Sequence, residues 1–478
     1  MSLLSYETLR RTGCQSYLLE SAPERVLQFG EGNFLRAFVD YFIDVANETA
    51  GFHGKVVVVQ PIPMPAVRGK FEDQDCLYTL YLRGIERGER VERKRIVSCI
   101  SRCISAAEEF GALLACAHSP DLEYIVSNTT EAGIVFRPED RMDAPEAAAF
   151  PGKLALFLYE RYRCLPDKGF VLLPCELIEE NGKALLACVQ QYIAAWGLPA
   201  GFGRWVEEQN VFCSTLVDRI VPGYPADAEA LDGENGYEDG LMVSAEPFGF
   251  WAVEGPARLN GDLPFARAGL PVLVTEDCTG YKQRKVRILN GAHTATVCAG
   301  LLCGLETVGD MMADPLIRPF LERAVAREII PTLDLPRAEL EEFAASVTER
   351  FQNPFIRHEL LTITLNSTSK WRARVLPSVT GYLERSGELP KLLTFSFAAY
   401  AECFRCGRFP CQDEAEVLGF FAAHREAAPE ALMDALCART DFWGMDLGTI
   451  PGFFAAVTEA LGTIQAEGMR HALEAVLA

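Results

Sequence analysis

The chain has 478 residues, enough for two or three domains, and its 49% hydrophobic and 23% charged residues are ordinary for a globular protein. No run of about 18 uncharged apolar residues predicts a transmembrane helix. The formal net charge of -21 argues against nucleic acid and anionic membranes as partners, but permits a small anionic substrate at a locally basic site. The first residues lack the apolar core of a signal peptide, and most of the 16 cysteines lie in apolar segments, which favours free thiols in a cytoplasmic protein.

The chain begins with a pattern of strand, turn, helix and second strand. Residues 25–30 predict a short buried strand, Glu31 to Asn33 a turn, and residues 34–49 a helix with apolar residues at helical spacing. Residues 55–60 are a β-branched run, typical of a strand buried on both faces. Such a βαβ unit predicts a parallel sheet.

Two further buried strands are predicted at residues 122–128 and 169–175, helices at 150–164 and 183–197, and a last strand of this half at 270–277. From about Lys285 onward the pattern changes to helical runs, at residues 288–305, 316–328, 337–351, 389–402 and 464–477. We therefore expect an α/β domain with a parallel sheet over residues 1–280, followed by a mostly α-helical domain over residues 281–478.

The turn after the first strand has glycines where a dinucleotide fingerprint belongs. Gly30 permits a tight turn, and Gly32 lets backbone N–H groups approach a pyrophosphate at the helix N-terminus. Leu35 occupies the slot of the usual third glycine, and such turns also occur without a ligand, but the βαβ context favours nucleotide binding. The candidate cofactor contacts are Gly30, Gly32, Asn33, Phe34, Arg36, Gln60 and Asn128. Gln60 stands where an acid would hold a ribose 2′-OH, and no Arg follows at once to hold a 2′-phosphate; we favour NAD over NADP.

Lys285, Asn290 and His293 lie at i, i+5 and i+8 of a predicted helix. On an α-helix they span an arc of about 140°, and Lys285 must reach forward by roughly 12 Å to share a site with His293. A proton source with an amide and an imidazole around one point suits a carbonyl that is being reduced. The alternative is an amphipathic helix with a surface lysine and one hydrogen-bonded core histidine. Gly291 leaves space for something to approach this helix.

Other polar residues have two interpretations each. Asn128, Thr129 and Glu131 follow a predicted strand, and either line a ligand or cap the next turn. Asp218 and Arg219 interrupt an apolar stretch, as a buried ion pair or as a substrate contact.

The cations Lys370, Arg372 and Arg374 near Trp371 predict either a solvated helix face or a cluster that binds a carboxylate or phosphate. The pattern closest to a metal site is a group of three cysteines without a fourth ligand at a familiar zinc spacing: Cys403, Cys406 and Cys411. We favour incidental cysteines or a redox-sensitive loop, and predict no metal.

Together these segments resemble the long-chain polyol dehydrogenase family, also called the mannitol dehydrogenase family, from about residue 25 to the C-terminus. The most specific feature is the K-x₄-N-x₂-H spacing of Lys285, Asn290 and His293. The segments that carry the resemblance are GEGNFLRAFV (30–39), DCLYTL (75–80), SNTTEAGI (127–134), VDRIVPG (217–223) and KVRILNGAHT (285–294). The resemblance implies an N-terminal Rossmann-type domain, a helical C-terminal domain, an active site in the cleft between them, and a metal-independent, NAD-dependent reaction.

The resemblance also implies roles for single residues. Lys285 is the general acid–base, Asn290 holds the developing alkoxide, and His293 orients the reacting oxygen. Asp218 falls on a family position that contacts a substrate hydroxyl, and Lys370 on one that helps to bind substrate. Glu131 and Arg372 complete the set of candidate substrate contacts.

One departure from the family pattern concerns the loop after the strand at 169–175. Relatives that oxidise polyols carry Cys-Asp/Glu-Asn there, and the asparagine belongs to their oxyanion hole; here Leu177 takes its place, and Asn181 is the nearest amide. This departure favours the branch of the family that acts on hexuronates, whose carboxylate suits the cations at 370–374.

The resemblance therefore implies NADH-dependent reduction of the keto group of D-tagaturonate to D-altronate, in hexuronate breakdown. Reduction of D-fructuronate to mannonate, or oxidation of mannitol-type polyols, is the sibling alternative. A non-catalytic dinucleotide-binding sensor and a metal-dependent alcohol dehydrogenase are alternatives of other classes, which the intact Lys/Asn/His set and the absence of paired His/Cys ligand spacing disfavour. The expected partner is a small keto-uronate, and the protein is expected to be a monomer or a small homo-oligomer.

Overall fold

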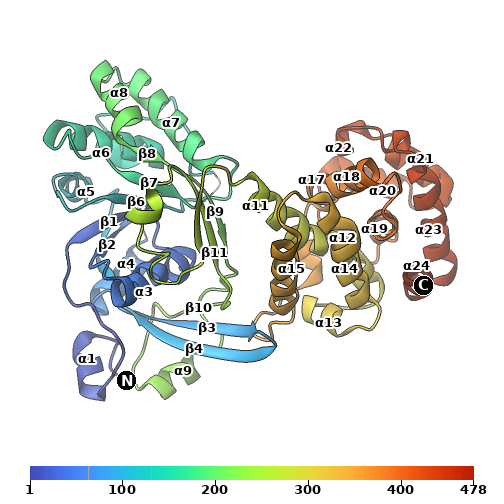
Figure 1. Ribbon diagram of the computed structural model, residues 1–478, viewed down its shortest axis with the longest axis horizontal. Coiled ribbons are helices and arrows are strands. Elements are labelled where there is room, and N and C mark those ends of the chain that lie inside the picture. The colour runs from blue at the N-terminus through green and yellow to red at the C-terminus, as the bar shows by residue number, and fades with distance from the viewer. Residues whose placement is uncertain (63, 131) are drawn as a thin grey trace. The chain divides into compact units, whose positions relative to one another are not determined.

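The computed structural model describes residues 1–62, 64–130 and 132–478, in two compact units (Figure 1). Unit 1 comprises Met1–Arg83 and Arg90–Cys278, and unit 2 comprises Gly84–Glu89 and Thr279–Ala478. Unit 1 is α/β and unit 2 is mostly helical, so the predicted fold class is confirmed. The candidate Glu131 lies outside the described residues.

Unit 1 is built on a six-stranded sheet of order β5-β2-β1-β6-β7-β8, in which all neighbours are parallel. Its strands are β1 (Glu24–Phe29), β2 (Lys55–Gln60), β5 (Ile100–Ser105), β6 (Tyr124–Ser127), β7 (Val171–Pro174) and β8 (Val211–Phe212). Counted along the chain, this is the 3-2-1-4-5-6 order of the Rossmann fold. The order reverses between β1 and β6, and ligands of such sheets bind outside the carboxyl ends of the strands at that point.

Both faces of this sheet are covered, as the continuous β-branched run of β2 predicts. Val56 and Val58 belong to one hydrophobic core, and Val57 and Val59 to the other. One face is covered by a continuous helical stretch made of α2 (Asn33–Leu35), the π-helix η1 (Arg36–Asp40) and α3 (Tyr41–Ala50). The other face is covered by helices that lie together in Figure 1: α5 (Phe110–Cys116), α6 (Phe150–Cys164), α7 (Asn181–Ala195) and α8 (Ala200–Gln209).

Two small sheets complete unit 1, and most of their strands are not predicted from the sequence. They have the orders β10-β3-β4 and β12-β11-β9. Their strands are β3 (Tyr78–Glu86), β4 (Glu89–Val97), β9 (Ser214–Asp218), β10 (Val243–Ala245), β11 (Phe250–Glu254) and β12 (Val272–Thr275). The strand predicted at 270–277 is β12, and it lies in a small sheet. The remaining helices of unit 1 are α1 (Tyr6–Thr12), α4 (Pro65–Asp73), η2 (Pro145–Ala147), α9 (Ala228–Asn235) and α10 (Leu259–Asp262).

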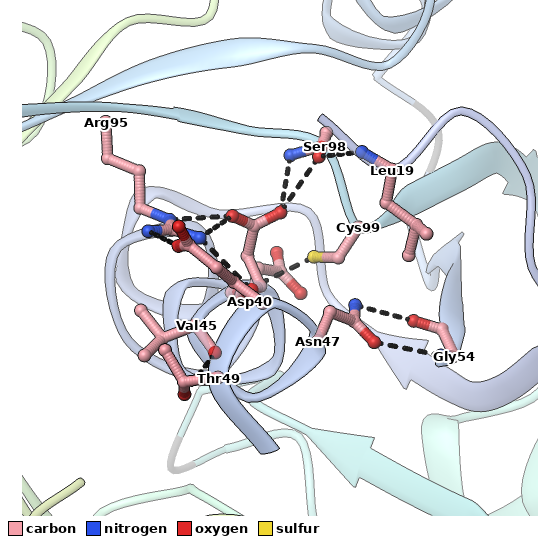
Figure 2. Close-up of polar contacts among 11 residues, drawn as sticks. Leu19, Asp40, Val45, Asn47, Thr49, Gly54, Arg95, Ser98 and Cys99 are labelled. Carbon is pink, nitrogen blue, oxygen red and sulfur yellow. Dashed lines mark hydrogen bonds and ion pairs between the residues drawn. The ribbon is translucent and has the colours of Figure 1, made fainter. Parts of the chain in front are cut away.

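Polar contacts anchor the helical stretch that follows β1 (Figure 2). The buried carboxylate of Asp44 accepts hydrogen bonds from Arg95 Nε at 2.7 Å and from Ser98 N at 2.8 Å. Asn47 donates to Gly54 O and accepts from Gly54 N, both at 2.9 Å, which fixes the turn into β2. These contacts hold the helix that begins at the glycine turn in a fixed position on the sheet.

Unit 2 is a helical domain around the buried helix α12 (Ala292–Leu302), whose residues up to Leu301 are all buried. Its first helices are α11 (Thr279–Arg284), the π-helix η3 (Lys285–Gly291), α13 (Val308–Ala313), α14 (Ile317–Ala324), the π-helix η4 (Val325–Ile329), η5 (Ile330–Thr332) and α15 (Arg337–Phe351). The others are α16 (Leu360–Ile363), α17 (Ser367–Arg374), α18 (Leu376–Ser386), α19 (Lys391–Arg405), α20 (Ala415–Ala423), α21 (Pro429–Cys437), α22 (Thr440–Trp443), η6 (Leu447–Thr449), α23 (Phe453–Glu467) and α24 (Met469–Leu477).

Two helix predictions in unit 2 need correction. The helix predicted at 464–477 is divided between α23 and α24 at Gly468, whose φ of 88° only glycine adopts without strain. The helix around Lys285 is a π-helix where an α-helix was expected. Among the described residues, no helix is both long and apolar enough to cross a membrane.

Candidate active site

The glycine turn lies at the point where the strand order of unit 1 reverses. Asn128 N donates to Phe29 O at 3.0 Å, which ties the ends of β6 and β1 together. Gly30 has a φ of 121°, and a Cβ there would come within 2.9 Å of Asn128 O, so this position requires glycine. A Cβ on Gly32 would meet nothing within 4 Å, which leaves the helix N-terminus open to a ligand.

The buried side chain of Arg36 supports this turn through hydrogen bonds. Its buried guanidinium donates to Glu31 O at 3.2 Å, to Asn33 Oδ1 at 2.6 Å and to Leu241 O. Burial lowers the pKa of Arg36. Arg36, a candidate cofactor contact, thus stabilises the turn, while Gly32 and Asn33 are exposed at its surface.

Gln60, at the end of β2, lies beside Glu31 of the glycine turn. Its Nε2 donates to Glu31 Oε1 at 3.4 Å and to Met64 O at 3.2 Å, and its Oε1 has no hydrogen-bond partner among the described residues. Burial raises the pKa of Glu31. Glu31 could not be predicted as part of this group, because the ribose-binding acid of a dinucleotide site usually follows the second strand and does not lie in the glycine turn.

The loops after β6 and β7 are joined through Glu176. This buried carboxylate accepts hydrogen bonds from Ser127 Oγ at 3.0 Å, from Thr129 N at 2.9 Å and from Thr129 Oγ1 at 3.1 Å. Asn128 Nδ2 donates to Cys175 O at 2.9 Å. Asn128 and Thr129 therefore connect the two loops, next to the turn at Gly30.

The side-chain amide of Asn181 forms all of its hydrogen bonds within the fold. Its Nδ2 donates to the carbonyls of Pro174, Glu176 and Thr215, and its Oδ1 accepts from Gly182 N and Thr215 N. An amide has two N–H donors, so Asn181 has none left for a substrate oxygen. It does not replace the amide that is missing at Leu177, which is 62% exposed.

Asp218 and Arg219 lie at the end of β9, and their side chains have different surroundings. The guanidinium of Arg219 donates to Ala37 O at 2.7 Å and to Phe248 O at 2.8 Å, so it holds the backbone of unit 1 together. Asp218 is buried, with 4% of its surface exposed. A contact of Asp218 with a substrate hydroxyl stays a prediction.

In unit 2, the three candidate catalytic residues lie on the helix formed by η3 and α12. In a π-helix the backbone hydrogen bond joins residues five apart, so Lys285 and Asn290 are one turn apart on the same side. Asn290 and His293 are three residues apart, which also places them on one side. The π-turn thus brings the three side chains closer together than the predicted α-helical arc. A π-turn inside a helix is rare and is frequent at functional sites.

His293 is a buried, neutral imidazole. Its ring is stacked on Phe351 with centroids 3.9 Å apart, and meets the ring of His358 edge-on at 5.2 Å. Burial lowers the pKa of His293 well below its ordinary value, and the positive charges of His358, Arg350, Arg374 and Lys370 lower it further. Its Nε2 has no hydrogen-bond partner within the described residues.

The helix α17 packs against η3 and brings cations to this site. A Cβ on Gly291 would come within 3.1 Å of Arg374 O, so the expected space at this glycine admits the backbone of α17. Lys370 Nζ donates to Ile363 O at 3.0 Å, and Arg374 is half-buried. Arg372 is exposed, with its Nη1 at 3.5 Å from Asp441 O, and Lys370 and Arg374 have the larger effect on the pKa of His293.

The three cysteines considered for a metal form a loose group. Cys403 Sγ and Cys411 Sγ are 4.0 Å apart, and all 16 cysteines are free. In the part of the chain that the structure describes, no group of three or more His, Cys, Asp or Glu residues is placed to hold a metal ion.

Comparison with known proteins places the whole chain among dehydrogenases. The family model of the mannitol dehydrogenase Rossmann domain matches residues 24–266, and that of the mannitol dehydrogenase C-terminal domain matches residues 277–465. The altronate oxidoreductase of Klebsiella pneumoniae (strain 342) is 45% identical over 467 residues, which cover 95% of this chain and 96% of that protein. The altronate oxidoreductase of Escherichia coli (strain SMS-3-5 / SECEC) is 44% identical over 466 residues, 94% of this chain and 96% of that protein.

Two solved structures share the fold at 22% identity. D-Sorbitol dehydrogenase in its substrate-free form has a TM-score of 0.83 and covers 98% of this chain and 100% of its own. The mannitol 2-dehydrogenase of Pseudomonas fluorescens, in a ternary complex with NAD and D-mannitol, has a TM-score of 0.72 and covers 99% of both chains.

Proposed function

Because this chain belongs to the mannitol dehydrogenase family, we propose that it reduces the keto group of D-tagaturonate to D-altronate with NADH. The membership confirms the family predicted from the glycine turn and the Lys285 motif. The chain is thus an oxidoreductase that acts on CH–OH groups. The choice of substrate rests on the altronate oxidoreductases, at up to 45% identity over nearly the whole length of both chains.

The observation that carries the proposed chemistry is the π-turn that aligns Lys285, Asn290 and His293. We assign to Lys285 the proton that the keto oxygen receives during reduction and returns during oxidation. Asn290 and His293 hold that oxygen while its negative charge develops. The amide of Asn290 makes no hydrogen bond within the described residues, and the buried His293 is kept neutral, so both are suited to an oxygen ligand.

The turn between β1 and α2 fits a dinucleotide. Gly30 allows a close approach that a Cβ would block, Gly32 is open, and Gln60 Oε1 is a buried acceptor without a partner among the described residues. We assign Gly30, Gly32, Asn33, Phe34, Gln60 and Asn128 to the binding of NADH. When bound, NADH supplies the hydride for the keto carbon.

The substrate contacts of this proposal are Asp218, for a hydroxyl, and the cations of α17. Since Asn181 has no free donor, its side-chain amide does not take the role of the asparagine that Leu177 replaces. The oxyanion then depends on Asn290 and His293, together with the proton of Lys285.

Substrate profiling tests this function. NADH oxidation is followed by absorbance with D-tagaturonate, D-fructuronate and D-fructose, each with and without EDTA. We expect turnover of D-tagaturonate that EDTA does not change, and the lowest rate with D-fructose. Preference for D-fructuronate or D-fructose would keep the chemistry and replace the substrate, while no turnover of any of the three would favour a non-catalytic dinucleotide sensor.

A further inference from the structure

We propose that Arg374, with Lys370 one turn before it on α17, binds the carboxylate of the keto-uronate. This inference rests on the proposed function and names the residues that select an acidic sugar over a neutral one. It assigns the principal role to Arg374, and none to Arg372.

The position of Arg374 follows from the packing of α17 on η3. The close approach of Gly291 to Arg374 O places the last turn of α17 directly against the π-turn of Lys285 and Asn290. Lys370 and Arg374 are four residues apart, so their side chains are neighbours on one face of α17. Both of their charges act on His293. The two cations therefore lie beside the residues assigned to the keto oxygen.

Arg374 is a half-buried cation. Within the described residues its guanidinium makes no hydrogen bond and no ion pair, and burial lowers its pKa. Other arginines in unit 2 form ion pairs with carboxylates of the protein: Arg284, Arg318, Arg337, Arg357, Arg385, Arg405, Arg439 and Arg470. An unpaired guanidinium in a partly desolvated position is stabilised by an anion that arrives from outside.

Lys370 completes the positive site. In the described parts of the chain its Nζ donates to one acceptor, Ile363 O at 3.0 Å, and an ammonium has three N–H donors. The nearby carboxylate of Asp413 is held by Thr368, through its N at 3.0 Å and its Oγ1 at 2.8 Å. Asp413 thus binds the first turn of α17, and Lys370 and Arg374 remain to bind the ligand.

The chemistry of this pair suits a carboxylate. The planar guanidinium offers two parallel N–H groups to the two carboxylate oxygens, and Lys370 adds a point charge. In D-tagaturonate the carboxylate is at the end of the chain remote from the keto group, whereas D-tagatose has a hydroxymethyl group there. A hydroxymethyl group cannot form the charged, bidentate contact, so the pair distinguishes these two substrates.

The test compares kcat/KM for D-tagaturonate and D-tagatose in the wild type and in Arg374→Gln and Arg374→Lys. We expect Arg374→Gln to lower kcat/KM for D-tagaturonate by about 10- to 100-fold, mainly through KM, because a hydrogen-bonded ion pair is lost. The value for D-tagatose should stay within about twofold. Arg374→Lys should recover part of the loss, since it keeps the charge and not the planar fork.

The matched control is Arg327→Gln, which removes the same charge from an exposed position of unit 2; it should leave both substrates unchanged. The melting temperature reports whether each variant is folded, and NADH affinity, measured by fluorescence, reports whether it binds the cofactor. Equal losses for both substrates in Arg374→Gln, or a selective loss in Arg372→Gln alone, would overturn the assignment.

If the wild type reduced neither sugar, the proposed function would fail and binding would decide the carboxylate site separately. Calorimetric titration with D-altronate and with the neutral polyol D-altritol would then be compared in the wild type and Arg374→Gln. Weaker binding of D-altronate alone in the variant would support the site, and unchanged binding would overturn it.

Discussion

The imidazole of His293 lies flat on the ring of Phe351, with centroids 3.9 Å apart and planes at 12°. The edge of His358 meets the same imidazole at 5.2 Å, so aromatic rings define its orientation from two directions. Nε2 of this ring is buried and has no hydrogen-bond partner among the described residues. The packing of α15 on the helix that carries His293 thus orients its imidazole, and the proposed function uses this ring to hold the keto oxygen.

Replacing Phe351 by Leu should lower kcat, in addition to any fall in the melting temperature. The imidazole loses its flat support, and a small displacement of an orienting group costs about 10-fold or more in kcat. We expect Phe351→Leu to lower kcat for D-tagaturonate by about 10-fold, with a smaller change in KM. Phe320→Leu removes a similarly buried ring from unit 2 and should lower the melting temperature alone. Equal kcat values for the two variants would contradict the role of the stacking.

His293 should not titrate during catalysis at neutral pH. Burial and neighbouring cations lower its pKa well below 6.5, so the ring stays neutral as the pH falls through the ordinary range of histidine. The pH profile of kcat/KM should therefore show no inflection from His293 between about pH 6 and 9. His293→Gln should lower the whole profile without changing its shape. An inflection near pH 6.5 in the wild type that disappears in His293→Gln would refute this.

Asp40 should make the protein less stable as the pH rises. Burial raises the pKa of this carboxyl from 3.8 to about 7, and only Gln28 donates to it, at 3.2 Å, among the described side chains. Between these two values the folded state binds more protons than the unfolded state, so stability falls as the pH rises from about 4 to 7. Above pH 7 the loss reaches a ceiling of about 4 kcal/mol.

Urea unfolding at pH 5 and pH 8 tests this with Asp40→Asn, which should gain stability relative to the wild type at pH 8 and little at pH 5. Asp44 follows Asp40 by four residues, one helical turn, but it accepts hydrogen bonds from Arg95 and Ser98. Asp44→Asn should therefore destabilise the protein at both pH values. A uniform loss of stability in Asp40→Asn would show that Asp40 is ionised in the folded state.

The sequence predicts the layers of unit 1 well, because each layer has a local signature. The glycine turn and the β-branched run at 55–60 predict β1, the first helix and β2 closely, and residues 150–164 match α6. The hairpin of β3 and β4 has no such signature, since β4 (Glu89–Val97) is mostly polar and exposed. Strands of this kind are defined by pairing with distant segments, which local patterns do not encode.

The candidate site could be predicted in part only. The residue types and spacing of Lys285, Asn290 and His293 identify the chemistry, but apolar periodicity does not distinguish a π-turn from an α-turn. The packing of α17 on η3 brings Arg374 close enough to lower the pKa of His293, across a long sequence separation, so its role could not be separated from that of Arg372. The saturation of Asn181 by five backbone groups is likewise a tertiary property.

Glu31 should favour NADH over NADPH. It lies beside Gln60 at the end of β2, where the adenosine ribose of a dinucleotide binds in this fold, and a carboxylate repels a 2′-phosphate. Arg68, on the helix α4 that follows β2, forms ion pairs with Glu72, Glu108 and Glu109 at 2.9, 3.2 and 2.9 Å, so its charge is already balanced by the protein. We expect Glu31→Gln to raise kcat/KM for NADPH by about 10-fold, which is within the free energy of one hydrogen bond to a charged group. An unchanged ratio of the two cofactors would remove Glu31 from this role.

The central claim is that Lys285 delivers the proton to the keto oxygen of a keto-uronate. It is tested most directly by NADH oxidation with D-tagaturonate in the wild type and Lys285→Ala, with NADH affinity measured by fluorescence in both. The loss of a positioned general acid predicts a fall in kcat of about 10²- to 10⁴-fold, with NADH affinity retained. A Lys285→Ala protein that still reduced D-tagaturonate at a rate near that of the wild type would contradict the account.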